Sequence, residues 1–148
     1  MYGKQDFLKN IVLKKLVIMT AEDVAKEYNL NLFAVECFEE TVRTGMPFGK
    51  MLTEYEVLEL YMEGFSFREI GYLKGITKEG VRYIFDRLPI EKDEVKKEHR
   101  ERRKELWRKV RHERILEEVE KVGVEGAAEV LGYSVRYLNI LLRDMKRR

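Results

Sequence analysis

One pattern recurs three times in the sequence and limits most strongly what the chain can fold into. A small residue is followed four positions later by a residue that tolerates positive φ, then by a helix-capping residue and by apolar residues at helical spacing. The small residue, the turn residue and the cap are, in the three copies, Ala25, Asn29 and Asn31; Gly71, Gly75 and Thr77; and Ala128, Gly132 and Ser134. Each copy therefore predicts two helices joined by a tight turn.

The residue types agree with a helix-turn-helix unit. Two short helices that cross at about 90–120° need a small residue at the crossing and often glycine at the bend. Ser66 with Glu69 predicts a capping box at the start of the middle unit. The apolar residues predicted to be buried on the second helices are Val35, Phe38 and Val42; Val81, Ile84, Phe85 and Leu88; and Leu138, Leu141 and Leu142.

The spacing of prolines and the absence of strand patterns predict the architecture. Pro47 and Pro89 each follow a stretch of helical periodicity, and no stretch alternates apolar and polar residues between turn signals. We expect an all-α fold with two to three tandem helix-turn-helix units and a long charged linking helix. The predicted segments are a helix-turn-helix-like unit at 1–48, a second unit at 49–89, the linking helix at 90–121 and a last unit at 122–148.

The linking helix is predicted because Glu91–Lys121 contains no glycine or proline. Between Lys96 and Arg114 it carries ten basic and four acidic side chains, which suit either phosphate tracking or a solvated helix with Glu–Lys and Glu–Arg pairs. Its second half also has an apolar side that must pack on the last unit or on a partner chain, and Trp107 is expected in the same packing. The apolar residues are Leu106, Val110, Ile115, Leu116 and Val119.

Composition restricts the class of protein. Of the 148 residues 45% are apolar, and 7 Phe and 8 Tyr are among them, so the chain has enough apolar surface to fold. The single cysteine, Cys37, excludes an intramolecular disulfide and has no spacing typical of a zinc site, which predicts an intracellular, cytoplasmic and metal-free protein. The apolar run Ile11–Met19 is interrupted by lysines and is too short to span a bilayer. The abundance of Lys and Glu is typical of proteins from hot environments.

Two segments resemble known DNA-binding units. Residues 52–88 resemble the promoter-reading C-terminal domain of sigma factors and the related unit of response regulators, through Leu52–Glu54, Gly64, Ser66, Glu69–Ile70 and Gly75–Ile76. They depart from that pattern at Lys74, which stands where the family has an apolar residue, while Leu73 lies one place early. Residues 123–143 resemble the Fis-type DNA-binding unit. The resemblances imply that both segments are helix-turn-helix modules that contact duplex DNA.

The outward face of each second helix decides which copy reads DNA, because this helix enters the major groove. The last copy presents donors for guanine and adenine edges, apolar contacts for thymine methyls and a basic tail. Its candidate residues are Ser134, Val135, Arg136, Asn139, Ile140, Arg143, Lys146 and Arg147. The middle copy presents a mixed face on which the candidates are Thr77, Lys78, Arg82 and Tyr83.

The first copy presents a different surface. Leu32, Phe33 and Cys37 are predicted to lie there. Glu36 and Glu40 lie beside them, and their carboxylates would repel phosphates. This surface therefore suits a protein partner, or it is covered by the helix predicted from Asp6 to Ile18.

These patterns predict a protein that binds duplex DNA in a sequence-specific manner and regulates transcription. We expect no enzymatic activity and no cofactor, since the sequence around His99 and His112 has no Ser, Cys or carboxylate pattern typical of an activated nucleophile or a metal site. Two alternatives remain open. One is a viral or plasmid DNA-packaging adaptor similar to a small terminase, and the other is a protein-interaction module that docks on RNA polymerase. A second copy of the chain is a further possible partner.

Overall fold

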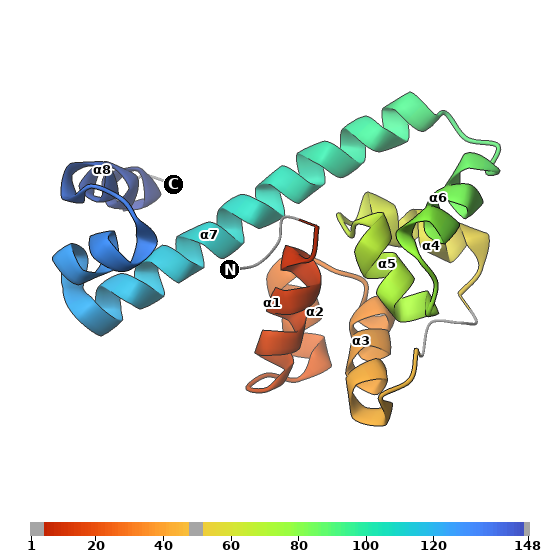
Figure 1. The fold of residues 1–148 in the computed structure, drawn as a ribbon, viewed down its shortest axis with the longest axis horizontal. Helices are drawn as coiled ribbons and strands as arrows, with labels where there is room; N and C mark the ends of the chain where they lie inside the picture. Colours follow the sequence, from red (N-terminus) through yellow and green to blue (C-terminus); the bar gives the residue numbers. More distant parts are fainter. Residues whose placement is uncertain (1–4, 48–51, 147–148) are drawn as a thin grey trace. The chain divides into compact units, whose positions relative to one another are not determined.

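The computed structural model describes residues 5–47 and 52–146. Within these residues the chain forms eight α-helices and no β-strand, so the predicted all-α fold class is confirmed (Figure 1). The helices are α1 (Phe7–Leu16), α2 (Ala21–Tyr28), α3 (Leu32–Thr44), α4 (Glu54–Met62), α5 (Phe67–Lys74), α6 (Lys78–Asp86), α7 (Lys92–Leu131) and α8 (Val135–Lys146).

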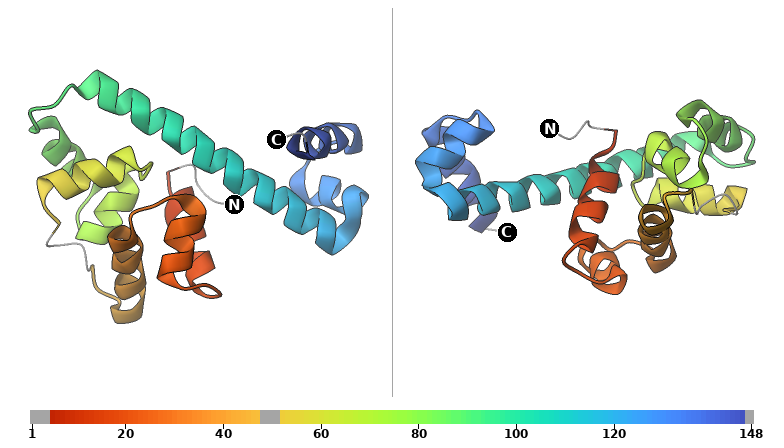
Figure 2. Two further views of the ribbon diagram at one scale, coloured as in Figure 1. Left: turned by 180° about the vertical axis from the view of Figure 1, so that it is seen from behind. Right: turned by 60° about the horizontal axis from the view of Figure 1, so that its bottom comes forward.

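The chain divides into two compact units, Met1–Trp107 (unit 1) and Arg108–Arg148 (unit 2). Unit 1 holds α1 to α6 and the first part of α7, and unit 2 holds the rest of α7 and α8. α3 packs on α5 as well as on α1 and α2, and Figure 2 shows these helices side by side, so the first two predicted segments form one unit. The predicted boundary near 89 is the connection between α6 and α7, and the one near 48 lies outside the described residues.

All three predicted turns are present with the expected local geometry. Asn29, Gly75 and Gly132 have φ values of 52°, 73° and 75°, in the left-handed region that glycine and asparagine adopt most easily. The caps are also confirmed, because the side chains of Asn31, Thr77 and Ser134 accept the N–H groups of Phe33, Gly80 and Tyr137. Each pair of helices is therefore defined by interactions within a few residues of its turn.

The small residue before the middle turn has a steric reason to be glycine. A Cβ added to Gly71 would lie 2.6 Å from the carbonyl oxygen of Ile76, a distance at which the backbone must move. Lys74, the departure from the sigma pattern, donates from Nζ to the carbonyl oxygen of Leu52 at 2.7 Å, while Leu73 fills the core. The ammonium group of Lys74 is thus bonded to the backbone, and Leu73 is the buried apolar side chain beside this turn.

Aromatic side chains form much of the core of unit 1. Phe38 stacks on Phe65 with ring centroids 5.3 Å apart, and Tyr61 contacts Phe85 at 5.0 Å. Most of the predicted apolar stripes are buried or half-buried as expected. Val42 is an error of the prediction, because it is exposed in the last turn of α3, whereas its neighbour Thr41 is buried.

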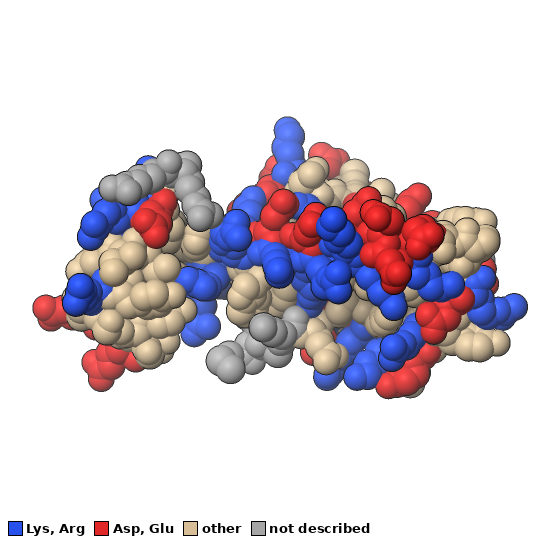
Figure 3. Space-filling view, turned by 90° about the horizontal axis from the view of Figure 1, so that it is seen from above, with Lys and Arg blue, Asp and Glu red and all other residues tan. Residues whose placement is uncertain are grey.

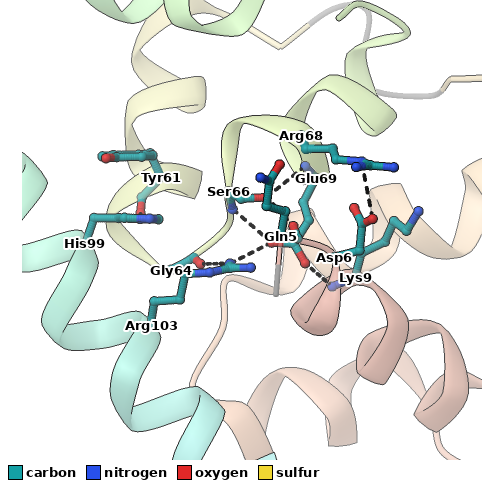
Figure 4. Close-up of polar contacts among 10 residues, drawn as sticks. All are labelled: Gln5, Asp6, Lys9, Tyr61, Gly64, Ser66, Arg68, Glu69, His99 and Arg103. Carbon is teal, nitrogen blue, oxygen red and sulfur yellow. Dashed lines mark hydrogen bonds and ion pairs between the residues drawn. The ribbon is translucent and has the colours of Figure 1, made fainter. Parts of the chain in front are cut away.

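Polar contacts that the sequence did not indicate hold the first part of α7 against the other helices of unit 1. Arg103 donates from Nη1 to Glu69 at 2.7 Å and to the carbonyl oxygen of Gly64 at 2.6 Å, as Figure 4 shows. Glu69 is completely buried and also accepts the N–H groups of Ser66 and Lys9, at 2.8 and 2.5 Å. A buried carboxylate with a cation and several N–H donors is stable only as a complete set.

Two expectations about this helix are wrong. Trp107 does not join the packing of the last unit but contacts Phe7 of α1 edge to face, with ring centroids 5.0 Å apart. Leu106 likewise belongs to unit 1, where it lies against the position that a Cβ on Gly64 would take. An amphipathic stripe shows that a helix is covered but does not indicate which element covers it.

Unit 2 has a small core in which α7 and α8 meet. Its buried residues are Ile115, Ala127, Ala128 and Leu138, and partly buried apolar side chains such as Val119 surround them. Leu116, predicted to be on the apolar side, is exposed. α7 continues to Leu131 but is interrupted at Gly123, whose φ of 78° and ψ of 172° are not helical. The interruption at Gly123 separates the linking part of α7 from residues 124–131, which form the first helix of the last helix-turn-helix unit.

Candidate nucleic-acid interface

The outward face of α8 in unit 2 carries the candidate residues of the last copy. Arg136, Asn139, Ile140 and Arg143 are spaced by three and four positions, so they share one face of the helix, and all are exposed. Leu138 is completely buried on the other side. Ser134, Val135 and Lys146 are exposed as well, and Arg147 lies outside the described residues. One side of α8 therefore packs in the core of unit 2, and the opposite side is exposed to solvent and carries both polar and apolar residues.

Ser134 has a local role besides the predicted contact. Its Oγ accepts the N–H of Tyr137 at 3.1 Å and so caps α8, which leaves the hydroxyl proton to donate to a ligand. Tyr137 contacts Tyr133 edge to face at 5.2 Å, which stiffens the start of the helix. In Figure 3 the visible face of unit 2 is mostly uncharged, and its basic side chains lie at the edges.

The outward face of α6 in unit 1 is smaller and mixed in charge. Thr77, Lys78, Arg82 and Tyr83 are all exposed, and Tyr83 keeps 62% of its surface. The guanidinium of Arg87 lies 5.3 Å from the centre of the Tyr83 ring. The four candidate residues of the middle copy are therefore accessible on one helix.

Only some of the basic residues of α7 are available to a ligand. Arg102 donates to the carbonyl oxygens of Tyr28 and Asn29 at 2.6 and 2.9 Å, and Arg103 is held by Glu69. On the face of unit 1 drawn in Figure 3, Lys and Arg side chains lie beside Asp and Glu side chains rather than forming one continuous basic area. The idea that this helix tracks phosphates is weakened, since two of its cations stabilise the fold.

The first copy has an exposed apolar surface above an acidic pocket. Leu32 and Phe33 are exposed, Phe33 by 52%, so the prediction that α1 covers them is wrong. A pocket of 240 Å³ beside them is lined by Glu56, Glu59 and Glu63. Burial raises the pKa of the Glu63 carboxyl to about 7, although the N–H of Asn31, which Glu63 accepts at 2.6 Å, opposes the shift.

Cys37 lies in the wall of the same pocket and is buried, so the prediction that it belongs to the outward face of α3 is wrong. Burial and the nearby carboxylates of Glu56 and Glu36 raise the pKa of its thiol to about 11, so it is protonated at neutral pH. No group of three or more His, Cys, Asp or Glu side chains in the described part of the chain is arranged to hold a metal ion. None of the helices within residues 5–47 and 52–146 is long and apolar enough to cross a membrane.

Sequence reasoning missed two features near the candidate residues. A second pocket, of 310 Å³, adjoins Lys78 and Arg82, and Glu69 organises the start of α5 beneath it. The Ser66–Glu69 spacing predicted the capping box, but nothing local indicated that the same carboxylate binds Arg103, 34 positions away.

No protein-family model, curated protein or solved structure matches this chain in searches of the three kinds. The candidate interface therefore rests on the residues and geometry described above.

Proposed function

We propose that the chain binds duplex DNA in a sequence-specific manner, reads base edges with α8 and acts in transcription regulation. The observation that carries this proposal is the separation of faces on α8. Leu138 anchors the helix in the core, while Arg136, Asn139, Ile140 and Arg143 extend from the opposite side. A recognition helix in the major groove needs one side packed on its own domain and polar side chains exposed on the other side, and α8 has this arrangement.

The side chains on this face match the groups that base pairs present in the major groove. Arg136 and Arg143 suit the O6 and N7 acceptors of guanine, and Asn139 suits the N6 and N7 pair of adenine. Ile140 and Val135 are apolar and exposed, so they fit thymine methyl groups. Lys146 extends the face by one further turn with a charge suited to phosphate.

α6 supports the proposal as a second, weaker contact. Lys78 and Arg82 are one helical turn apart and exposed, but Glu79 and Asp86 on the same helix oppose a polyanion. We therefore assign α6 phosphate contacts that contribute affinity without reading sequence.

A second candidate function is docking on a protein through the first copy. The exposed ring of Phe33 above the Glu56, Glu59 and Glu63 pocket favours it, because an apolar surface with acidic walls repels DNA but suits a basic protein segment. RNA polymerase remains one such partner, and a ring-forming packaging adaptor is the other alternative for the DNA-binding surfaces.

The test is fluorescence anisotropy with a pool of random duplexes over a range of salt concentrations, followed by sequencing of the bound fraction. We expect one enriched motif and an affinity that falls with salt. Arg136→Ala should lose about 1–3 kcal/mol of discrimination at one base pair. Arg43→Ala is a matched control, because Arg43 lies on α3 and is paired with Glu40.

The outcomes separate the candidate functions. Enrichment that Arg136→Ala blurs and Arg43→Ala preserves supports sequence reading by α8. Salt-dependent binding without any enriched motif, together with a large ring in light scattering, favours the packaging adaptor. Absence of salt-dependent binding rules out the DNA function and leaves docking on a protein.

A further inference from the structure

The pocket of 310 Å³ beside α6 is built from parts of unit 1 that are distant in sequence. α4, α5, α6 and the first part of α7 each contribute side chains to its lining, together with Gln5 before α1. Pockets for small organic ligands begin at about 300 Å³, so its volume admits a small ligand. It is separate from the outward face of α8, which lies in unit 2.

The charged side chains of the lining favour an anion. Arg68, Lys78 and Arg82 contribute three cations, whereas Glu79 is the single carboxylate of the lining described. Arg68 is positioned by an ion pair with Asp6, 3.2 Å from Nε to Oδ2, which Figure 4 shows at the start of α1. Because Asp6 offsets the charge of Arg68, the cations of the lining to which a phosphate can bind are Lys78 and Arg82, one helical turn apart on α6.

The uncharged part of the lining is aromatic. Tyr61 stacks on His99 with ring centroids 3.8 Å apart and an interplanar angle of 5°, and it stacks on Phe67 at 4.8 Å (Figure 4 labels Tyr61 and His99). His99 is nearly buried, its Nδ1 lies 2.7 Å from the carbonyl oxygen of Tyr61, and burial lowers its pKa, which favours a neutral ring. Phe67 also contacts Phe85, with ring centroids 5.4 Å apart, but it is partly exposed and lines the pocket, so a planar group can contact the exposed part of its ring.

We propose that this pocket binds a small organic phosphate of the mononucleotide class, with the phosphate on Lys78 and Arg82 and the base against Phe67. The ligand then occupies the two cations that α6 offers to DNA, so ligand and duplex compete. The competition rests on the proposed DNA-binding function, whereas the binding of the small ligand does not. Such a pocket makes the contact through α6 sensitive to a metabolite.

The test is calorimetric titration of the full chain with adenosine 5′-monophosphate and, separately, with inorganic phosphate. We expect one nucleotide per chain and weaker binding of phosphate. Arg82→Gln should weaken nucleotide binding about tenfold, the effect of losing one charge-assisted hydrogen bond. Arg87→Gln is the matched control, because Arg87 is exposed, directly follows the last residue of α6 and is not among the lining residues described. Glu79→Gln should tighten binding, which a purely structural role of Glu79 would not produce.

Five outcomes overturn the proposal or a part of it. If the nucleotide does not bind, or if Arg82→Gln and Arg87→Gln weaken it equally, the pocket assignment is wrong. Equal affinity for inorganic phosphate overturns the role of the aromatic lining. Arg82-dependent binding of duplex without binding of nucleotide assigns the pocket to the DNA backbone instead. Nucleotide binding that leaves the affinity for duplex unchanged overturns the competition.

The proposal and the DNA function fail in distinguishable ways. Arg136→Ala, in unit 2, should impair DNA reading and leave nucleotide binding as in the unaltered chain. If no duplex binds but the nucleotide binds with the expected dependence on Arg82, the pocket assignment holds and the DNA function falls.

Discussion

Unit 1 and unit 2 each present a helix with an exposed polar face, α6 and α8, but they bury very different groups beneath it. Unit 1 surrounds its turns with aromatic rings and with the buried Glu69–Arg103 pair. Unit 2 spans only Arg108–Arg148, and the buried cluster at its core consists of Ile115, Ala127, Ala128 and Leu138. Domains near about 40 residues rarely bury enough surface to be stable without further support.

The comparison teaches that one local motif is compatible with two kinds of core. The small residue, the left-handed turn and the cap are the same in both units, because they depend on contacts within a few residues. What differs is how stability is distributed. The stability of unit 1 depends on polar contacts between segments that are distant in sequence, such as Glu69–Arg103. The stability of unit 2 depends on a few buried apolar side chains.

The largest effect is expected from Glu69→Ala. The substitution leaves the Arg103 guanidinium without its carboxylate and removes acceptors for the N–H groups of Ser66 and Lys9. Breaking such a buried pair costs about 3–5 kcal/mol. Denaturant unfolding followed by the fluorescence of Trp107, which packs on Phe7 in unit 1, measures the loss. Glu79→Ala on the exposed face of α6 should change stability by less than about 0.5 kcal/mol. A loss as small as that of the control would show that the network is not essential.

Leu138→Ala tests whether unit 2 depends on its few buried side chains. We expect a loss of about 2–5 kcal/mol, because the leucine is completely buried and a cavity remains. Amide hydrogen exchange of α8 should become fast, while the Trp107 unfolding transition of unit 1 stays unchanged. Ile140→Ala, at an exposed position of the same helix, is the control for stability. Simultaneous loss of both units would contradict their independence.

Gly71→Ala sharpens the comparison, because Ala25 and Ala128 occupy the corresponding positions in the other two copies. A methyl group at Gly71 meets the carbonyl oxygen of Ile76, so we expect a loss of about 1–3 kcal/mol despite the better helix propensity of alanine. Gly80→Ala on α6 provides the contrast. Its Cβ would meet only side-chain atoms of Ile76 and Thr77 at 3.4 Å or more, and it should raise stability by up to about 1 kcal/mol. Thermal unfolding of both variants checks the two signs, and equal signs would contradict the steric argument.

The smallest effect concerns the pH dependence of unit 1. Burial raises the pKa of Glu63 from 4.5 to about 7, so the folded state favours the protonated carboxyl. The penalty is absent below about pH 4.5, grows as the pH rises and is complete above about pH 7. Glu63→Gln keeps an acceptor for the N–H of Asn31 and should stabilise unit 1 by about 1 kcal/mol at pH 8, less than the full linkage because the side chain is partly exposed.

His99 titrates with the opposite sign. Burial lowers its pKa, so its contribution is present above the ordinary histidine value of 6.5 and is lost as the pH falls. The difference between Glu63→Gln and the unaltered chain isolates the carboxyl, and unfolding midpoints between pH 5 and pH 8 measure it. A difference that does not change with pH would contradict the assignment to Glu63.

Local sequence predicted the helical elements well but not their contacts. The turns at Asn29, Gly75 and Gly132 follow from residues that tolerate positive φ, and the caps follow from side chains that reach the first free N–H groups. The exposed face of α8 was predicted from its periodicity, because apolar residues such as Leu138 recur on one side of the helix and charged residues such as Arg136 on the other. The pockets were not predicted, since the residues that line them come from several helices.

The sequence by itself determined the all-α class, the three turns and the outward faces of α6 and α8, because these depend on dihedral preferences and on periodicity within about a dozen residues. On α3 the same periodicity misplaced Val42, which is exposed, and Cys37, which is buried. Only the tertiary structure decided that Trp107 and Arg103 stabilise unit 1, that Phe33 stays exposed and that Lys78 and Arg82 border a pocket. An apolar or charged stripe indicates that a face has a partner. Which element is that partner depends on long-range packing, which no local pattern encodes.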